Sequence, residues 1–233
     1  GKVSPRQLAF DLDHRPALGE EDFLVAPCNN EAVGWIDRFP NWPSHALIIS
    51  GPSGSGKTHL SRVFMAKAKA VELQASSLLD DAVPVLPDAA AVVIEDADVL
   101  AGHAVAEEAL FHLYNQARTN GTMLLLTAGS PASRWQLRLA DLTSRLRSVP
   151  TVEISEPDDT LLTTILVKLF ADRQIAIDDT VLQYVVPRIE RTFSAIQKFV
   201  AAADKKALED KRRITVPLAR AVLQPDQRLP FPD

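Results

Sequence analysis

The eight residues from Gly51 to Thr58 constrain this chain more than any other part of its sequence. They read Gly-Pro-Ser-Gly-Ser-Gly-Lys-Thr and fit the pattern G-x-x-x-x-G-K-[ST] without a gap. Glycines let successive backbone amides turn toward phosphate oxygens, while the lysine reaches the β- and γ-phosphates and the threonine hydroxyl binds Mg²⁺. We therefore expect a nucleotide site with ATP or ADP as ligand. Its predicted residues are Gly51, Pro52, Ser53, Gly54, Ser55, Gly56, Lys57 and Thr58, with His59 beside them.

The surrounding pattern predicts a fold in which such a loop can work. An apolar run at 45–50 precedes the loop, and apolar residues at helical spacing follow it over 57–70. Further strands are expected at 71–73, 90–94, 122–127 and 151–154, with helices at 104–118 and 137–146. Short apolar strands that alternate with helices indicate an α/β domain, a parallel sheet with helices on both faces.

The strand pattern stops at Pro157, and four helical segments follow it. Thr192 or Ser194 is expected to cap the third of these helices and Thr215 the fourth. We therefore expect a small all-helical domain after the α/β domain. The predicted division is an extended N-terminal arm over 1–22, the α/β domain over 23–155, the helical domain over 156–224 and a tail over 225–233.

Two acids end the strand expected at 90–94, about forty residues after the loop. Next to a phosphate-binding loop, Glu95 and Asp96 are expected to hold Mg²⁺ together with Thr58, partly through water, and to polarise the attacking water. The usual order of the pair is Asp followed by Glu or Asp. A glutamate in the first position has a longer arm, which leaves the metal geometry and the hydrolysis rate open.

Composition narrows the function classes. The net charge of −5 argues against a protein whose main work is to grip DNA through its phosphates. The single cysteine, Cys28, allows no internal disulfide and suits a reducing compartment. No apolar run has the length of a membrane span, so we expect a soluble cytoplasmic protein. Neither a cluster with metal-ligand spacing nor a nucleophile elbow is present.

Five segments together resemble the AAA+ initiator clade, which contains the bacterial replication initiator DnaA and its relative Hda. The resemblance runs from about Phe23 to Leu223. The segments that carry it are Phe23-Leu-Val-Ala-Pro-Cys-Asn-Asn, Gly-Lys57-Thr-His59-Leu60, Leu124-Leu-Leu-Thr127-Ala-Gly-Ser-Pro, Asp141-Leu-Thr-Ser-Arg145-Leu and Ile189-Glu-Arg191-Thr-Phe.

The resemblance implies a role for each segment. Leu24 and Val25 would lie against adenine, and the Thr127 hydroxyl would orient water or phosphate. Arg191 would bind this chain's own nucleotide from the helical lid, and Arg145 would reach the γ-phosphate on a neighbouring subunit. Each of these residues also has a purely structural alternative. Thr127 would simply end a strand, and Arg191 would pair with a lid acid such as Glu190. Arg145 would be a solvated arginine like Arg138 and Arg147.

Two features favour an Hda-like regulator over an initiator. We expect no DNA-binding domain like that of DnaA, because the sequence ends about ten residues after the last expected lid helix. Its arm resembles the motif by which Hda docks on the replicative sliding clamp, with Gln7, Leu8, Phe10 and Leu12 as the contact residues.

The resemblance implies a regulator that works in its ADP form, hydrolyses little ATP itself and stimulates hydrolysis of DnaA-bound ATP in trans, which suppresses re-initiation. Its partners would be DnaA and the DNA polymerase sliding clamp, with further copies of this chain as an additional candidate. The alternatives are a stand-alone ATPase such as a helicase loader, an initiator fragment that binds DNA, and a P-loop kinase.

Overall fold

The structure is a computed structural model that describes residues 13–15, 23–79 and 84–224. The chain divides into two compact units. One runs from Asp13 to Glu156, and the described part of the other begins at Pro157. Each unit is described by itself.

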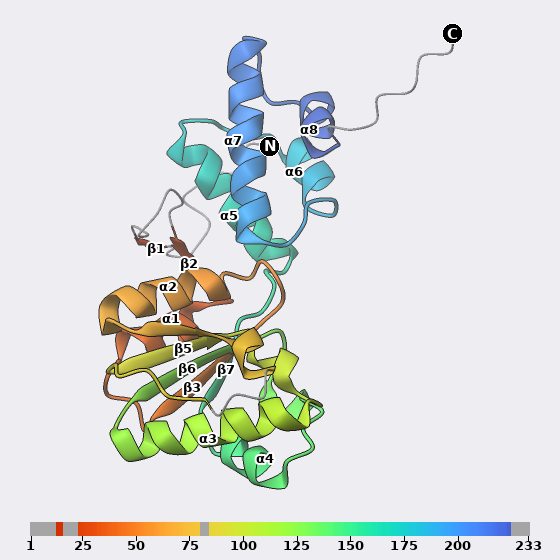
Figure 1. Ribbon diagram of the computed structural model, residues 1–233. Helices are drawn as coiled ribbons and strands as arrows, with labels where there is room; N and C mark the ends of the chain where they lie inside the picture. The colour runs from red at the N-terminus through yellow and green to blue at the C-terminus, as the bar shows by residue number, and fades with distance from the viewer. Residues whose placement is uncertain (1–12, 16–22, 80–83, 225–233) are drawn as a thin grey trace. The chain divides into compact units, whose positions relative to one another are not determined.

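The first unit is built on a five-stranded sheet with the order β4-β5-β6-β3-β7, and every neighbouring pair in it is parallel. Strand β3, the first of these five strands along the chain, lies between β6 and β7. The carboxyl ends of all five strands share one edge (Figure 1). Crevices at this edge of an open parallel sheet are the usual place for ligands. The strands are β3 (Ala46–Ser50), β4 (Val71–Gln74), β5 (Ala91–Glu95), β6 (Met123–Ala128) and β7 (Thr151–Glu153).

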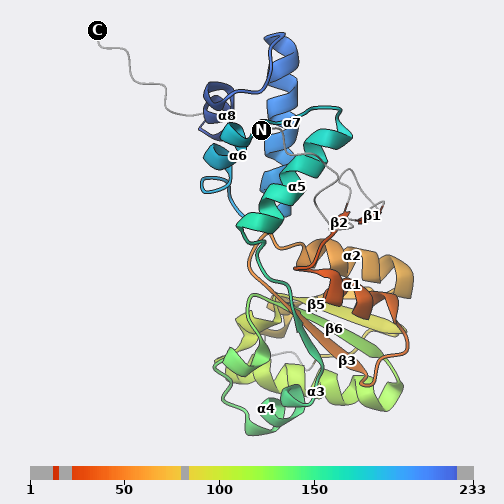
Figure 2. The same ribbon diagram turned by 180° about the vertical axis from the view of Figure 1, so that it is seen from behind.

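Helices cover both faces of the sheet, as Figures 1 and 2 show from opposite sides. On one face α1 (Asn30–Asp37) and α2 (Lys57–Ala68) pack over alternate strand residues such as Leu47 and Val93. On the other face α3 (Ala104–Asn120) and α4 (Ala140–Arg147) pack over the intervening ones, such as Ile48. Side chains of successive strand residues point to opposite faces, so one continuous apolar strand serves two cores.

Shorter elements complete this unit. Strands β1 (Asp13–Arg15) and β2 (Phe23–Val25) pair antiparallel, with His14 opposite Leu24. The segment 13–15, which the sequence assigns to an extended arm, is therefore paired with the start of the α/β unit. The 3₁₀ helices are η2 (Ala75–Leu79), η3 (Ala97–Leu100) and η4 (Ala132–Arg134).

The described part of the second unit is helical throughout. Three of its helices begin with a side-chain cap: Asp158, Thr192 and Thr215 each accept a hydrogen bond from a backbone amide of the first turn. Apolar faces of all four helices bury residues, and Phe170 meets Phe199 edge to face. The helices are α5 (Asp159–Asp172), α6 (Asp179–Val185), α7 (Phe193–Glu209) and α8 (Val216–Leu223).

The predicted fold class is confirmed: a parallel sheet with helices on both faces is followed by a helical region. Several details differ from the sequence-based expectation, which did not include the strand pair β1 and β2. Helix α1 was not among the expected elements, and α4 begins at Ala140 rather than at residue 137.

Candidate functional site

The loop from Gly51 to Gly56 leaves the carboxyl end of β3 and leads directly into α2. Gly54 and Gly56 have φ angles of 76° and 99°, a left-handed conformation that favours glycine. The Gly51 amide donates to the Ala128 carbonyl at 3.1 Å, and the Ser55 amide donates to the Pro52 carbonyl at 3.1 Å. The loop is thus held to the end of β6 and curls back on itself, as a phosphate-binding loop requires.

Gly51 also marks a close approach between the loop and the end of β7. A Cβ atom at this position would lie 2.8 Å from the Ile154 carbonyl oxygen and 2.9 Å from Ser55 Oγ. The Ile154 amide donates to the Ser50 carbonyl at 2.7 Å, which fixes that backbone in place. Only glycine fits here without a shift of the backbone.

Lys57 lies in the first turn of α2 and folds over the loop. Its Nζ donates to the Gly51 carbonyl at 2.6 Å and to the Pro52 carbonyl at 3.0 Å. Burial lowers the pKa of Lys57, and the negative charges of Asp96, Asp98 and Glu95 oppose that shift.

The loop's surroundings fit an anionic ligand. The hydroxyls of Ser50 and Ser55 are buried, and neither has a hydrogen-bond partner in the part of the chain that the structure describes. A buried hydroxyl without a partner costs free energy, and a phosphate oxygen near the loop would relieve that cost. The amino end of α2, a partly buried ammonium group and these hydroxyls together form a site of the right chemistry for nucleotide phosphates.

Glu95 ends β5 and turns toward α2. Its carboxylate accepts a hydrogen bond from the hydroxyl of Ser61, a buried residue one turn after Thr58. The Ser61 hydroxyl also lies 2.8 Å from the Thr58 carbonyl. This contact ties the first acid of the pair to the helix that carries Lys57 and Thr58.

Asp96 and Thr127 lie in direct contact. Asp96 is exposed and has a φ of 54°, an uncommon conformation for a residue other than glycine. Its amide donates to Thr127 Oγ1 at 3.2 Å, so the threonine hydroxyl joins β6 to the acids after β5. Asp98, which sequence reasoning did not single out, accepts from the Gly129 amide at 3.0 Å and adds a third carboxylate to this edge.

Mg²⁺ would have Thr58, Glu95 and Asp96 as its protein neighbours. Mg²⁺ is commonly held by one or two carboxylates together with substrate phosphates, and this donor set suits that mode. Within residues 13–15, 23–79 and 84–224, no group of three or more His, Cys, Asp or Glu side chains is arranged to hold a metal ion.

The segment expected to contact adenine, with Leu24 and Val25, lies in β2 and the turn after it. Asn29, which is buried, closes this turn: its Oδ1 accepts from the Ala26 amide at 2.8 Å and its Nδ2 donates to the Leu24 carbonyl at 2.9 Å. The Ser155 amide donates to the Cys28 carbonyl at 3.2 Å. Ser155 directly follows Ile154, whose carbonyl oxygen lies close to Gly51. The turn and the phosphate-binding loop therefore meet the same stretch of backbone.

Arg145 lies on α4, whose buried side carries Leu142 and Leu146. It is half-buried, whereas Arg138 and Arg147 are exposed. No hydrogen bond or ion pair of the Arg145 guanidinium occurs within the described ranges.

Arg191 precedes the cap of α7 and is bound within the second unit. Its guanidinium pairs with the Asp159 carboxylate and donates to the Pro157 carbonyl at 3.0 Å. Pairing with a lid acid is the alternative that the sequence left open for this residue, although the partner is Asp159 rather than Glu190. The role of Arg191 in nucleotide binding stays a prediction.

Gln7, Leu8, Phe10 and Leu12 lie outside the described residues, so the predicted sliding-clamp motif stays a prediction. Of the described helices, none combines the length and the apolar character needed to cross a membrane.

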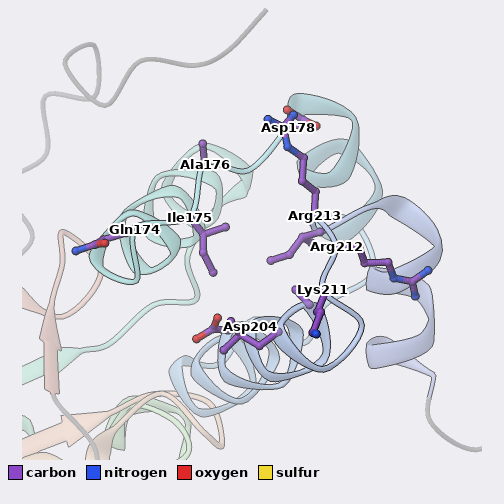
Figure 3. Close-up of a pocket in the computed structure, with 11 residues that line it drawn as sticks. Gln174, Ile175, Ala176, Asp178, Asp204, Lys211, Arg212 and Arg213 are labelled. Atoms are coloured by element: carbon purple, nitrogen blue, oxygen red, sulfur yellow. The ribbon is translucent and has the colours of Figure 1, made fainter.

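The helical unit contains a cavity of about 570 Å³ that sequence reasoning did not indicate. It lies where the ends of α5 and α7 approach the loop before α8, and Ile175 points into it (Figure 3). Arg213 points toward Asp178, whereas Arg212 points away. The cavity contains none of the predicted site residues.

Comparisons with known proteins give a consistent result. The family model described as "Hda, lid domain" matches residues 159–223. An uncharacterized protein of Haemophilus influenzae is 28% identical over 186 residues, which cover 76% of this chain and 80% of the relative. The chromosomal replication initiator protein DnaA of Flavobacterium psychrophilum is 21% identical over 94% of this chain. The chain spans about half the length of that DnaA, 51%.

Solved structures agree on the fold. Domain III of Thermotoga maritima DnaA matches with a TM-score of 0.67 at 18% identity, over 88% of this chain and 94% of that one. AMPPCP-bound DnaA from Aquifex aeolicus matches with a TM-score of 0.65 at 19% identity, over 80% of this chain and 65% of that one.

Proposed function

We propose that this chain, which is an Hda-like, DnaA-related AAA+ protein, acts in replication initiation. It binds an adenine nucleotide through Gly51–Thr58 and stimulates hydrolysis of DnaA-bound ATP through Arg145. The nucleotide in its own site acts mainly as a structural element. The chemistry takes place on the partner's ATP.

The observation that carries the proposal is the state of Arg145. Its side chain has no partner among the described residues, and it stands on a helix that Leu142 and Leu146 anchor to the core. A cation on a well-packed helix needs little reorganisation to meet charge that develops on a γ-phosphate. An arginine committed to a local ion pair would first have to break that pair.

The geometry of this chain's own nucleotide site supports nucleotide binding more clearly than it supports ATP hydrolysis. Lys57 and the hydroxyl of Ser55 lie on the loop that would take the phosphates. The first acid, Glu95, instead accepts a hydrogen bond from Ser61, which holds it toward α2. We infer that the chain binds ADP or ATP with Mg²⁺ and hydrolyses ATP slowly. When bound, Mg²⁺ would neutralise phosphate charge.

The sliding clamp is proposed as the second partner, on the resemblance of the arm alone. An extended peptide with Gln7 at a pocket rim and Leu8, Phe10 and Leu12 directed to apolar pockets suits recognition of this kind. Binding to the sliding clamp would place this chain beside DNA, where DnaA could bind it.

A stand-alone ATPase is the second candidate function. Asp96, Thr127 and Lys57 gather at one edge of the sheet, which is the arrangement that turnover in cis would use. Steady-state ATP hydrolysis by the chain alone, at a rate that partner proteins do not change, would favour this candidate.

The test of the proposal is Arg145→Ala, with Arg147→Ala as the matched control on the same helix. An arginine supplied in trans contributes about 10³–10⁵-fold to phosphoryl transfer. We expect Arg145→Ala to reduce stimulation of DnaA-bound ATP hydrolysis by about 10³-fold or to background, while its own nucleotide affinity changes less than about twofold. Arg147→Ala should stimulate like the wild type. Full stimulation by Arg145→Ala would rule Arg145 out as the finger.

A further inference from the structure

Glu107 on α3 is buried completely, with 0% of its surface exposed. In the described part of the chain it is the only charged side chain among the buried residues. It lies in the first turn of α3. A carboxylate is costly to bury unless hydrogen bonds satisfy it, so a buried glutamate is seldom found without partners. Its environment therefore indicates what it holds.

Within the described residues, the Glu107 carboxylate accepts hydrogen bonds from backbone amides outside α3. Oε1 accepts from the Gly102 amide at 2.7 Å and from the Arg138 amide at 3.1 Å. Oε2 accepts from the Arg138 amide at 2.9 Å and from the Leu139 amide at 2.7 Å. Hydrogen bonds to an ionised acceptor are stronger than neutral ones, so this is a firm junction.

Two of these amides belong to the residues directly before α4. Leu139 is the N-cap of that helix, with φ −79° and ψ 108°, and its side chain gives no cap to the first turn. Arg138 and Leu139 are exposed and half-exposed, so packing holds them less than it holds Leu142. The carboxylate thus fixes the point from which α4, and with it Arg145, starts.

The third amide connects the junction to the acidic edge of the sheet. Gly102 comes two residues after η3, the short helix that contains Asp98. Asp98 in turn accepts from the Gly129 amide at the exit of β6. Glu107 therefore joins the segment after Glu95 and Asp96 to the segment that begins the arginine helix.

We propose that Glu107 is a positioning residue: its buried carboxylate fixes the start of α4 and thereby the direction in which Arg145 is presented to a partner's nucleotide. The inference rests on the proposed function of Arg145, because direction matters only if Arg145 acts on something outside the chain. Glu107 itself touches no reacting atom.

The test uses the full chain with Glu107→Gln and, as the matched control, Glu108→Gln. Glu108 is the next residue on α3 and is exposed. Glutamine keeps the size of glutamate but turns an N–H₂ group toward amides that are themselves donors, so one side of the junction loses its acceptor. Thermal unfolding first establishes that each variant is folded at the assay temperature.

Two readouts separate positioning from general stability. Hydrogen exchange of the backbone amides over 138–143 should be about tenfold faster or more in Glu107→Gln, with exchange in β3 and β6 unchanged. At saturating concentrations of this protein, the maximal stimulation of DnaA-bound ATP hydrolysis should fall about tenfold or more. The protein concentration that gives half of the maximal stimulation, and the affinity for nucleotide, should not change to match. Glu108→Gln should match the wild type in both.

Three outcomes would overturn the inference. The first is unchanged hydrogen exchange over 138–143, and the second is full stimulation by Glu107→Gln in an assay in which the wild type is active. The third is a loss of stimulation accompanied by faster exchange of all amides and by changes in all binding constants. If Glu107→Gln does not fold, Glu107→Asp, which keeps the charge on a shorter arm, is measured in the same way. A wild-type chain that gives no stimulation contradicts the proposed function instead, and the exchange measurement still decides whether Glu107 anchors α4.

Discussion

At the scale of single residues, the nucleotide site depends on positions where no other side chain fits. Gly51 is the clearest case, since a Cβ atom there would lie 2.8 Å from a backbone oxygen of Ile154. Backbone that is fixed in the ladder between β3 and β7 cannot move aside without loss of sheet hydrogen bonds.

We therefore expect Gly51→Ala to weaken nucleotide binding at least about tenfold and to destabilise the chain by about 1–3 kcal/mol. Gly34 in α1 is the control, because nothing lies within 4 Å of a Cβ atom there. Gly34→Ala should raise the free energy of unfolding by about 0.5–1 kcal/mol, as a glycine in a helix interior is usually less stable than alanine. Denaturant unfolding and nucleotide titration of both variants measure this. Equal behaviour of the two would contradict the close-approach account.

The sequence identifies some of these residues and misses others for a physical reason. The loop from Gly51 to Thr58 is recognisable because the residues proposed to contact phosphates are contiguous. Ser61 and Glu107 act through partners 34 and 31 residues away, Glu95 and Arg138. No local pattern records such a contact, so only the fold reveals it.

At the scale of elements, the same distinction explains which boundaries are predictable. Thr192 and Thr215 cap their helices through bonds to amides three residues on. The sequence predicts Thr215 as a cap, and Thr192 is the first of the two candidates, Thr192 and Ser194, that it offers for the other helix. Helix α4 begins three residues later than its apolar spacing suggests, because the amides of Arg138 and Leu139 donate to a carboxylate of α3. Helix α1 is preceded by Asn29, whose amide group closes a turn instead of capping the helix, so it lacks the usual start signal.

The ion pair between Asp159 and Arg191 links the first turn of α5 to the residue before the α7 cap. Its side chains are 72% and 29% exposed, and exposed pairs contribute about 0–1 kcal/mol. The pair alone is therefore a weak reason for an arginine at this position, and binding of this chain's own nucleotide is the role that we propose for it.

Arg191→Ala and Asp159→Asn separate these two roles. Each should lower the free energy of unfolding by less than about 1 kcal/mol. Arg191→Ala should also weaken nucleotide binding about tenfold, since a charge-assisted hydrogen bond to phosphate is lost. Asp159→Asn should leave nucleotide affinity unchanged or improve it. If calorimetric titration gives equal affinities for the wild type and Arg191→Ala, Arg191 is a lid ion-pair residue only.

At the scale of the whole molecule, the chain combines an α/β unit that carries the proposed nucleotide site with a helical unit that matches the Hda lid domain. The predicted fold class holds throughout, because alternation of strands and helices is recorded in local periodicity. The partners are proposals of a different kind, because they depend on contacts with other molecules that we propose for Arg145 and for the sequence motif before Asp13.

The most direct measurement is the single-turnover hydrolysis rate of ATP bound to DnaA, with and without this chain and with and without sliding clamp loaded on DNA. Our account predicts a faster rate with the chain, a further increase with the loaded clamp, and loss of that increase when Gln7 and Leu8 are both replaced by alanine. A DnaA hydrolysis rate that this chain leaves unchanged under all of these conditions would contradict the account.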